Sequence, residues 1–243
     1  SVKAGYSVQQ NSVLGDLGEQ VIRGFGGRFT NALVKGLGDT VALTVALPQS
    51  VELGHGRKLC KNITIMKGHG GAGSIQAIAH DIDVACTNQI VSMMRDGVNM
   101  VRIQHTTSAD GRIRLAHHDI AQILTNQDEF HQSLVKLLDE PALMREWLPT
   151  VMPRPERRAN QTAAQYRATL QKYDTKLGVV RREYGRDFND NIRGTKLGVL
   201  WAFQGAEQHY TWAGEGRTHD TQIGRFLSHT QPVANRAYAA LTA

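Results

Sequence analysis

The chain has 243 residues, of which 41% are hydrophobic and 21% are charged. This length allows a full-sized core, and this composition excludes a wholly disordered protein. No run of about 18 apolar residues is present, which excludes a transmembrane helix. The chain begins at Ser1 without an initiator Met, and its first residues lack the apolar core of a signal peptide. We therefore expect a cytoplasmic protein, with further residues upstream of Ser1.

Positive charge is concentrated in the last part of the chain. The formal net charge is +6. Residues 1–150 carry 14 Lys and Arg against 14 Asp and Glu, a net charge of zero, whereas residues 151–243 carry 14 against 8, a net charge of +6. A basic region of this kind favours a polyanionic partner. The alternative is a solvated helical surface that is rich in arginine.

The first half of the chain reads as a short helix followed by a hairpin. Apolar residues recur at helical spacing over residues 13–24, with Ser12 as the N-cap. Residues 28–34 and 40–47 form the hairpin, and Pro48 is expected to end its second strand.

A second hairpin is predicted from alternating residues over 60–67 and a returning strand over 74–85. The glycine-rich tip between them runs from strand to strand and ends in Gly73-Ser74. A Walker phosphate loop instead ends in Gly-Lys-Ser/Thr and opens a helix, so the tip does not match that motif. A change of phase near residues 80–81 indicates a bulge or break in the returning strand.

From about residue 112 the pattern becomes helical. A helix over residues 89–95 and a strand over residues 100–104 precede this change. Residues 178–193 are polar and weakly patterned, which favours a loop. Further helices are predicted over residues 113–138, 141–148, 160–173 (capped by Asn160), 195–212 and 232–241.

These elements predict an α+β fold, in which a small antiparallel sheet of hairpins packs on helices and a helical part follows. We expect a sheet core over residues 1–110 and a mainly helical, basic part over residues 111–243, which is either a second domain or a continuation of the first.

Several polar and aromatic side chains allow two interpretations. Asp81 and Asp83 share one face of a strand, where they either hold a cation or belong to a polar sheet face, and we favour the sheet face. Arg102 either contacts a phosphate or pairs with a sheet carboxylate such as Asp83. The cluster of Trp201, Phe203, Tyr210 and Trp212 either stacks on bases or forms core, and we favour core.

Catalytic and metal signatures are not found in the sequence. It has no Gly-x-Ser-x-Gly elbow, no Cys-x-x-Cys and no convincing pair of carboxylates. Cys60 and Cys86 are expected to be free thiols, and Cys86 to be buried. We therefore predict no enzyme activity, no cofactor and no metal.

Five short motifs carry a resemblance to a known family when their order is considered. They are the Gly5 to Asn11 segment, Gly26-Gly-Arg-Phe29, Gly68 to Ser74, Val84-Ala-Cys-Thr-Asn88 and Val101-Arg-Ile-Gln-His105, and a Trp201 to Tyr210 segment follows them. In this order the chain resembles the phage and plasmid-like family catalogued as domain of unknown function 932. The tip departs from the family at His69-Gly70-Gly71, and Asp83-Val84-Ala85-Cys86 stands where the family has Arg before Val-Cys.

The resemblance implies a mobile-element protein of the host cell cytoplasm, without a settled activity. The strand and helix layout is similar in outline to ring-forming single-strand annealing proteins of phages, which is an analogy of fold. The functional hypothesis is single-stranded DNA binding, with annealing in recombination and a homo-oligomer. The alternative is a protein-interaction module, either a host-defence inhibitor or a virion-associated structural protein. The predicted DNA contacts are Lys61, Lys67, Arg102, Arg112, Arg114, Arg181, Arg182 and Arg186.

Overall fold

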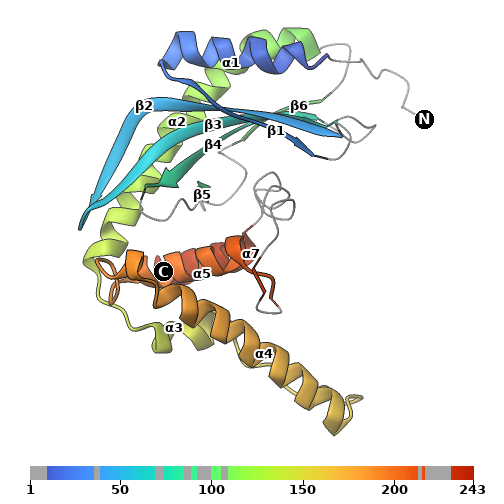
Figure 1. Ribbon diagram of the computed structural model, residues 1–243, viewed down its shortest axis with the longest axis vertical. Helices are drawn as coiled ribbons and strands as arrows, with labels where there is room; N and C mark the ends of the chain where they lie inside the picture. The colour runs from blue at the N-terminus through green and yellow to red at the C-terminus, as the bar shows by residue number, and fades with distance from the viewer. Residues whose placement is uncertain are drawn as a thin grey trace. The chain divides into compact units, whose positions relative to one another are not determined.

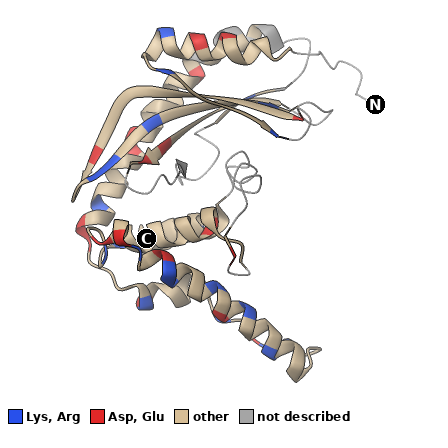
Figure 2. Cartoon of the chain, in the orientation of Figure 1, with Lys and Arg blue, Asp and Glu red and all other residues tan. Residues whose placement is uncertain are grey.

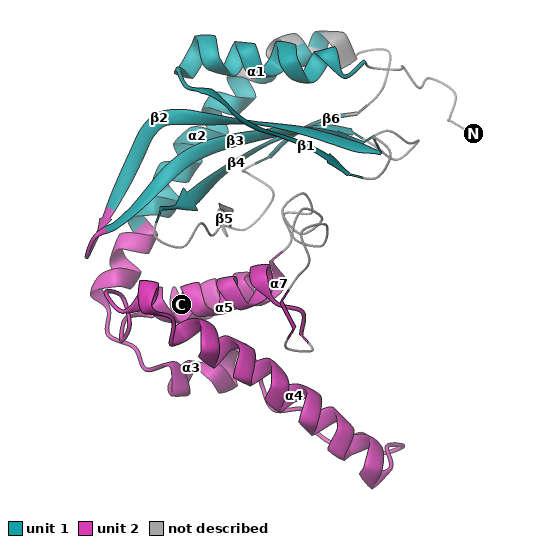
Figure 3. Cartoon of the chain, in the orientation of Figure 1, with its two compact units in different colours: residues 1–52, 57–132 teal, residues 53–56, 133–243 magenta. Residues whose placement is uncertain are grey.

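The fold was analysed in a computed structural model (Figure 1), which describes residues 10–35, 39–68, 74–84, 89–91, 100–104, 109–212, 215–216 and 231–243. The chain divides into two compact units (Figure 3). Unit 1 comprises residues 1–52 and 57–132, and unit 2 comprises residues 53–56 and 133–243. An antiparallel sheet with helices and a helical C-terminal part confirm the α+β class. In the described part of the chain, no helix is both long and apolar enough to cross a bilayer.

Unit 1 is built on a six-stranded sheet with the order β1-β2-β3-β4-β5, and β6 also pairs with β4. The antiparallel pairs β1–β2 and β3–β4 confirm both predicted hairpins. One edge of β4 is shared, because its first half pairs with β6 and its end pairs with β5. The strands are β1 Arg28–Lys35, β2 Thr40–Gly54, β3 Arg57–Gly68, β4 Ser74–Asp83, β5 Gln89–Val91 and β6 Met100–Gln104.

Two helices cover one face of this sheet, α1 (Ser12–Phe25) and α2 (Ala109–Asp139). Alternate residues of a strand point to one face, so Ile63 and Ile65 of β3 point to the same side. They share one apolar cluster with Leu17 of α1 and Ile120 of α2. This cluster is the core of unit 1.

Charged side chains continue the helix-covered face toward the end of β4. Lys61 and Asp81 are directly opposite each other in the β3–β4 register. The Lys61 amino group pairs with Asp128 of α2, and His131 Nε2 lies 2.7 Å from Asp81 Oδ2. Because these partners are on α2, the two pairs fix the helix on the sheet.

The opposite face of the sheet carries a row of hydrogen-bonded polar side chains. The Thr44 and Thr64 hydroxyl oxygens are 2.8 Å apart, and Thr64 Oγ1 is 2.9 Å from His80 Nε2. All three side chains are buried, so β2, β3 and β4 are linked by side chains as well as by their backbones.

Unit 2 is helical and is organised around α5 (Lys196–His209), in which every residue from Leu197 to Glu207 is buried. Helix α4 (Ala163–Tyr184) and helix α7 (Pro232–Leu241) pack against α5, and α3 (Met144–Val151) packs against both α4 and α7. Trp201 and Phe203 are fully buried, which confirms their assignment to the core. A short 3-10 helix, Asp187–Asn189, follows α4.

The predicted loop over residues 178–193 is wrong over residues 178–184, because α4 continues to Tyr184. Polar residues dominate this stretch, but Leu177, Val179, Val180 and Glu183 are buried in the helix. Tertiary packing therefore outweighs the weak local pattern.

Four smaller predictions are also corrected. Strand β2 does not end at Pro48. Its pairing with β1 ends at Ala46, so the exposed proline beyond that residue interrupts no hydrogen bond to β1. Residues 89–91 form a strand instead of a helix, since they complete the edge of β4. The β3–β4 register is continuous, so there is no bulge at residues 80–81. The N-caps are Asn11 and Thr162 in place of Ser12 and Asn160.

Cys60 is a free thiol, as predicted. The predictions for Cys86, for the glycine-rich tip at residues 69–73 and for residues 92–95 lie outside the described residues.

The buried Arg57–Asp83 pair predicts a large stability effect. Both side chains are fully buried. We expect Arg57→Met to lower the free energy of unfolding by about 3–5 kcal/mol, because it leaves a buried carboxylate without its cation. Adding Asp83→Leu should restore most of the loss. Urea denaturation measures both changes.

The neighbouring Lys58 provides the control, since its pair with Glu52 is exposed. Lys58→Met should change the free energy of unfolding by less than about 1 kcal/mol. An equal loss in the Arg57 and Lys58 variants would contradict the prediction.

Candidate functional site

The eight cations predicted from the sequence divide between the two units. Unit 1 contains Lys61, Lys67, Arg102, Arg112 and Arg114, and unit 2 contains Arg181, Arg182 and Arg186.

The two predicted lysines of unit 1 are buried. Lys61 is 8% exposed and pairs with Asp128, while Lys67 is 1% exposed and its Nζ lies 3.5 Å from Asn11 Oδ1. Burial lowers the pKa of the Lys67 amino group. Neither ammonium group is presented on a surface where a phosphate backbone would run.

Arg102 is exposed, and its Nε donates to Ser74 Oγ at 3.1 Å. The pair with Asp83, one of the two roles predicted for Arg102, is wrong, because Arg102 lies opposite Gln76, far along β4 from Asp83, and Arg57 binds Asp83. Arg112 and Arg114 lie on α2, but their side chains are outside the described residues.

The three arginines of unit 2 differ in their surroundings. Arg181 and Arg182 are exposed, and the Arg182 guanidinium lies 5.3 Å from the ring centre of Tyr210. Arg186 Nη1 lies 2.9 Å from the buried Glu183 Oε1, so part of its charge is neutralised within the unit.

A denser group of cations surrounds α4. Residues 152–182, which we call the cationic hairpin, carry eight Lys and Arg against two acids, a net charge of +6 that equals the net charge of the whole chain. Figure 2 shows basic positions repeated along α4. The cations are Arg154, Arg157, Arg158, Arg167, Lys172, Lys176, Arg181 and Arg182, and the acids are Glu156 and Asp174.

Seven of these cations, all except Arg182, have no carboxylate within ion-pair distance among the described residues. Six of the seven are exposed, and Lys176 is half-buried. By contrast, seven cations outside the hairpin are held in ion pairs, namely Arg23, Arg57, Lys58, Lys61, Arg186, Arg193 and Lys196.

Hydrogen bonds hold the segment before α4 alongside the helix. Tyr173 donates from its hydroxyl to the Met152 carbonyl at 2.9 Å, and Tyr166 donates to the Pro155 carbonyl at 3.1 Å. Gln161 Nε2 donates to Thr169 Oγ1 at 2.9 Å. These bonds place the arginines of the segment beside the lysines of the helix.

The first fourteen residues of α4 contain no buried residue, because the buried positions begin at Leu177. A capping box fixes the start of the helix. Thr162 Oγ1 accepts from the Gln165 backbone N–H at 3.2 Å, and Gln165 Oε1 accepts from the Thr162 N–H at 2.9 Å. Local bonds therefore maintain this half of the helix.

The cations of α4 lie on two faces. Successive helix residues are about 100° apart, which places Lys172 and Lys176 together on a first face, about 140° and 180° from Arg167. Arg167 and Arg181 share the second face with Asp174. The first face contains no acidic residue in this half of α4.

A shallow hollow of about 430 Å³ opens on the Lys172 face. Its lining contains two cations and no acidic residue. The lining residues are Arg158, Asn160, Gln161, Gln165, Ala168, Thr169 and Lys172.

Two half-buried aromatic rings lie next to hairpin cations. Lys176 Nζ is 6.0 Å from the ring centre of Trp212, and Arg182 lies over Tyr210. His209, one residue before Tyr210, has its pKa lowered by burial, an effect that Glu183 opposes and Arg186 reinforces. The surroundings of His209 therefore favour the neutral form of its imidazole.

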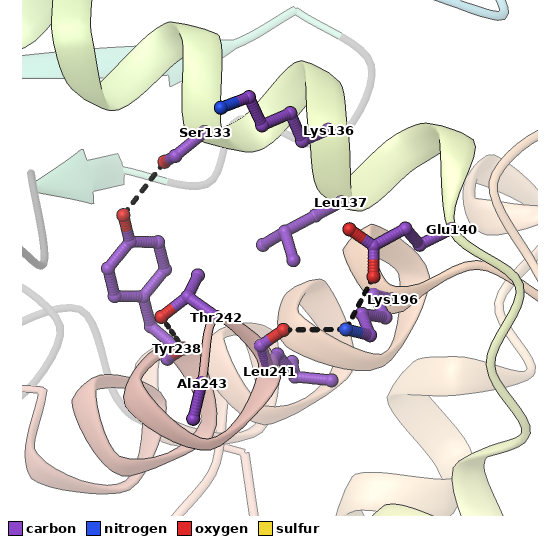
Figure 4. A pocket seen from close by; sticks show the side chains of 9 residues that line it. All are labelled: Ser133, Lys136, Leu137, Glu140, Lys196, Tyr238, Leu241, Thr242 and Ala243. Carbon is purple, nitrogen blue, oxygen red and sulfur yellow. Dashed lines mark hydrogen bonds and ion pairs between the residues drawn. The ribbon is translucent and has the colours of Figure 1, made fainter.

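Unit 2 has a second pocket, of about 400 Å³ (Figure 4). Its polar groups bind one another: Lys196 Nζ donates to the Leu241 carbonyl at 2.9 Å and pairs with Glu140, and the Ser133 and Tyr238 hydroxyls are 2.8 Å apart. These contacts join α2, α5 and α7, so we assign the pocket a structural role.

The buried polar groups that the structure describes in unit 1 contact one another within the fold. Within the residues described here, no three His, Cys, Asp or Glu side chains are grouped so that they could hold a metal ion. Asp81 and His131 contact each other but are buried between the sheet and α2. The hairpin remains as the chemically distinctive surface.

The model of one protein family, described as Domain of unknown function (DUF932), matches residues 1–237. The chain belongs to this family. No curated protein and no solved structure matches the chain. The match includes the whole cationic hairpin, so the hairpin lies within the DUF932 domain.

Six hairpin cations of this DUF932 protein are absent from the sequence-based prediction: Arg154, Arg157, Arg158, Arg167, Lys172 and Lys176. The net charge of a 30-residue window would have found them, because the two acids in this stretch are far outnumbered. That these cations lack partners is visible only in the structure.

The capping box of α4 predicts a local effect in the DUF932 protein. Thr162→Ala should raise hydrogen exchange over residues 163–176 about fivefold, because losing an N-cap costs about 1 kcal/mol and no buried residue compensates there. Exchange over residues 177–184 should stay unchanged. Mass spectrometry of the exchanging amides measures both regions.

Thr195→Ala is the matched control, since Thr195 Oγ1 caps α5 by accepting from the Gly198 N–H at 3.1 Å. This variant should leave exchange over residues 163–176 unaltered. A uniform increase along α4 in the Thr162 variant would contradict the local role of the cap.

Proposed function

We propose that this DUF932 protein binds single-stranded DNA through its phosphate backbone, and that the cationic hairpin supplies the contacts. The observation that carries the proposal is the set of seven hairpin cations without carboxylate partners in the described structure. Contacts to phosphates need charge and reach, and they carry no sequence preference.

The clustering of these cations argues against an ordinary solvated surface. Charges within a Debye length of about 8–10 Å repel one another, so an unbalanced group of this size opposes folding of the hairpin. Tyr166 and Tyr173 nevertheless hold its two segments together. A polyanion would remove the repulsion and release its own counterions on binding.

The neighbouring rings favour a single strand over a duplex. Tyr210 and Trp212 are half-buried and lie beside Arg182 and Lys176. Unpaired bases expose faces that stack on such rings, whereas a duplex buries them. Strand annealing and homo-oligomer formation stay predictions from the sequence.

Binding to a fluorescein-labelled oligothymidylate tests the proposal through fluorescence anisotropy at several salt concentrations. If four hairpin cations each neutralise one phosphate, log K should fall with log[salt] with a slope of about −3, or roughly 50-fold between 50 and 200 mM salt. Absence of binding at 50 mM salt would overturn the proposal.

A matched pair of triple variants localises the interaction. Arg154→Gln/Arg157→Gln/Arg181→Gln should weaken binding and lower the salt slope. Arg23→Gln/Arg28→Gln/Lys35→Gln removes the same charge from exposed positions of unit 1. An equal loss of affinity in both variants would show that overall charge, and not the hairpin, is responsible.

A further inference from the structure

We infer that the hollow on the Lys172 face of the cationic hairpin is a subsite for one phosphate group of the bound strand. This inference rests on the proposed function and assigns one phosphate contact to particular side chains. It concerns Arg158 and Lys172, which the sequence-based prediction does not include.

The two cations of the hollow provide complementary binding chemistry. Arg158 presents a planar guanidinium that can hold two phosphate oxygens at once, and Lys172 presents a compact ammonium. Both side chains are exposed, and neither has a carboxylate partner among the residues described. A phosphate is the group that satisfies both without displacing an internal ion pair.

Two glutamines of the hollow are already oriented as donors. Gln165 Oε1 accepts from the Thr162 N–H at 2.9 Å, and Gln161 Oε1 accepts from the Arg158 N–H at 3.3 Å. Because these oxygens bind the backbone, the amide NH₂ groups are the ends available to a ligand. Gln161 uses one of its hydrogens on Thr169 Oγ1 and retains the other.

The surroundings of the hollow favour an anion over a neutral ligand. No carboxylate lines it, and Asp174 lies about 160° from Lys172 around the axis of α4. The first turn of α4 contains no acidic residue. The capping box occupies the helix end itself, so the side chains make the subsite and the helix dipole only adds to their field.

The hollow has room for a phosphate together with its attached sugar. Its volume of about 430 Å³ lies within the range of roughly 300–1,000 Å³ for small-ligand sites. A phosphate between Arg158 and Lys172 would leave space for its attached sugar. Free phosphate and a nucleic-acid backbone share the chemistry recognised here, and the experiment separates them.

The test compares two double variants of the full chain that each remove two charges. Arg158→Gln/Lys172→Gln alters the hollow, and Arg167→Gln/Arg181→Gln alters the second face of α4. The hollow variant should bind oligothymidylate on the order of tenfold more weakly than the wild type. Its salt slope should fall by about 0.7, the value for one phosphate of a single strand.

The comparison variant should lose less affinity than the hollow variant, since its two cations are hairpin contacts outside the hollow and do not hold one phosphate between them. Circular dichroism of both variants checks that α4 is folded. If the wild type binds the oligonucleotide but the two variants lose affinity equally within about twofold, the subsite is overturned while the proposed function stands.

Inorganic phosphate provides an independent measurement. In NMR spectra its addition should shift the side-chain NH₂ signals of Gln161 and Gln165 in the wild type and in the comparison variant, but not in the hollow variant. Absence of these shifts in the wild type would overturn the subsite. Shifts with phosphate but no binding of the oligonucleotide would overturn both the proposed function and the assignment to a backbone phosphate.

Discussion

The packing of the C-terminal end of α4 on α5 is the constraint on which the cationic hairpin depends. Leu177, Val179 and Val180 are the apolar side chains that anchor the helix, and no residue before them is buried. Glu183 adds a buried carboxylate to this interface. The exposed cations of α4 are therefore carried by a helix that is fixed at one end, and the segment that carries the other exposed cations is hydrogen-bonded to this helix.

The sequence around the anchor is adapted to the buried carboxylate. A Cβ atom at position 205 would lie 2.4 Å from Glu183 Oε2, so Gly205 of α5 is needed for the carboxylate to approach the helix. Glu183 Oε1 in turn lies 2.9 Å from Arg186 Nη1 and forms an ion pair with it. Arg186 is thus used for structure, whereas the seven hairpin cations without a carboxylate partner among the described residues remain available for a ligand.

Much of the fold follows from the sequence, because its strands alternate and its long helices bury regular apolar stripes. Helix α7 was predicted with its observed bounds. The paired strands of both hairpins were predicted to within a few residues. The error at residues 178–193 arose because one face of α4 changes from solvent to core along its length. Local patterns do not show where a partner helix begins to cover a surface.

The site was predicted less well, for reasons that differ between residues. Lys61 lies two residues before Ile63, and Lys67 lies two residues after Ile65. The strand pattern therefore already placed both lysines on the same face as these core residues. The partner of Lys61 is Asp128, 67 residues away, and only the tertiary structure reveals it. Net charge describes how many cations a chain has, whereas their function depends on which of them the fold has already neutralised.

The balance of forces in the hairpin couples its stability to its ligand. A helix of about 12–15 residues without tertiary packing is marginal in water, and α4 has fourteen residues before its anchor of which none is fully buried. Like charges on the segment and the helix lower its stability further, while the capping box and the two tyrosine bonds oppose this. A polyanion that binds only the folded hairpin adds its binding free energy to that of folding. The same unpaired charges that weaken the free hairpin would then make it most ordered when a strand is bound.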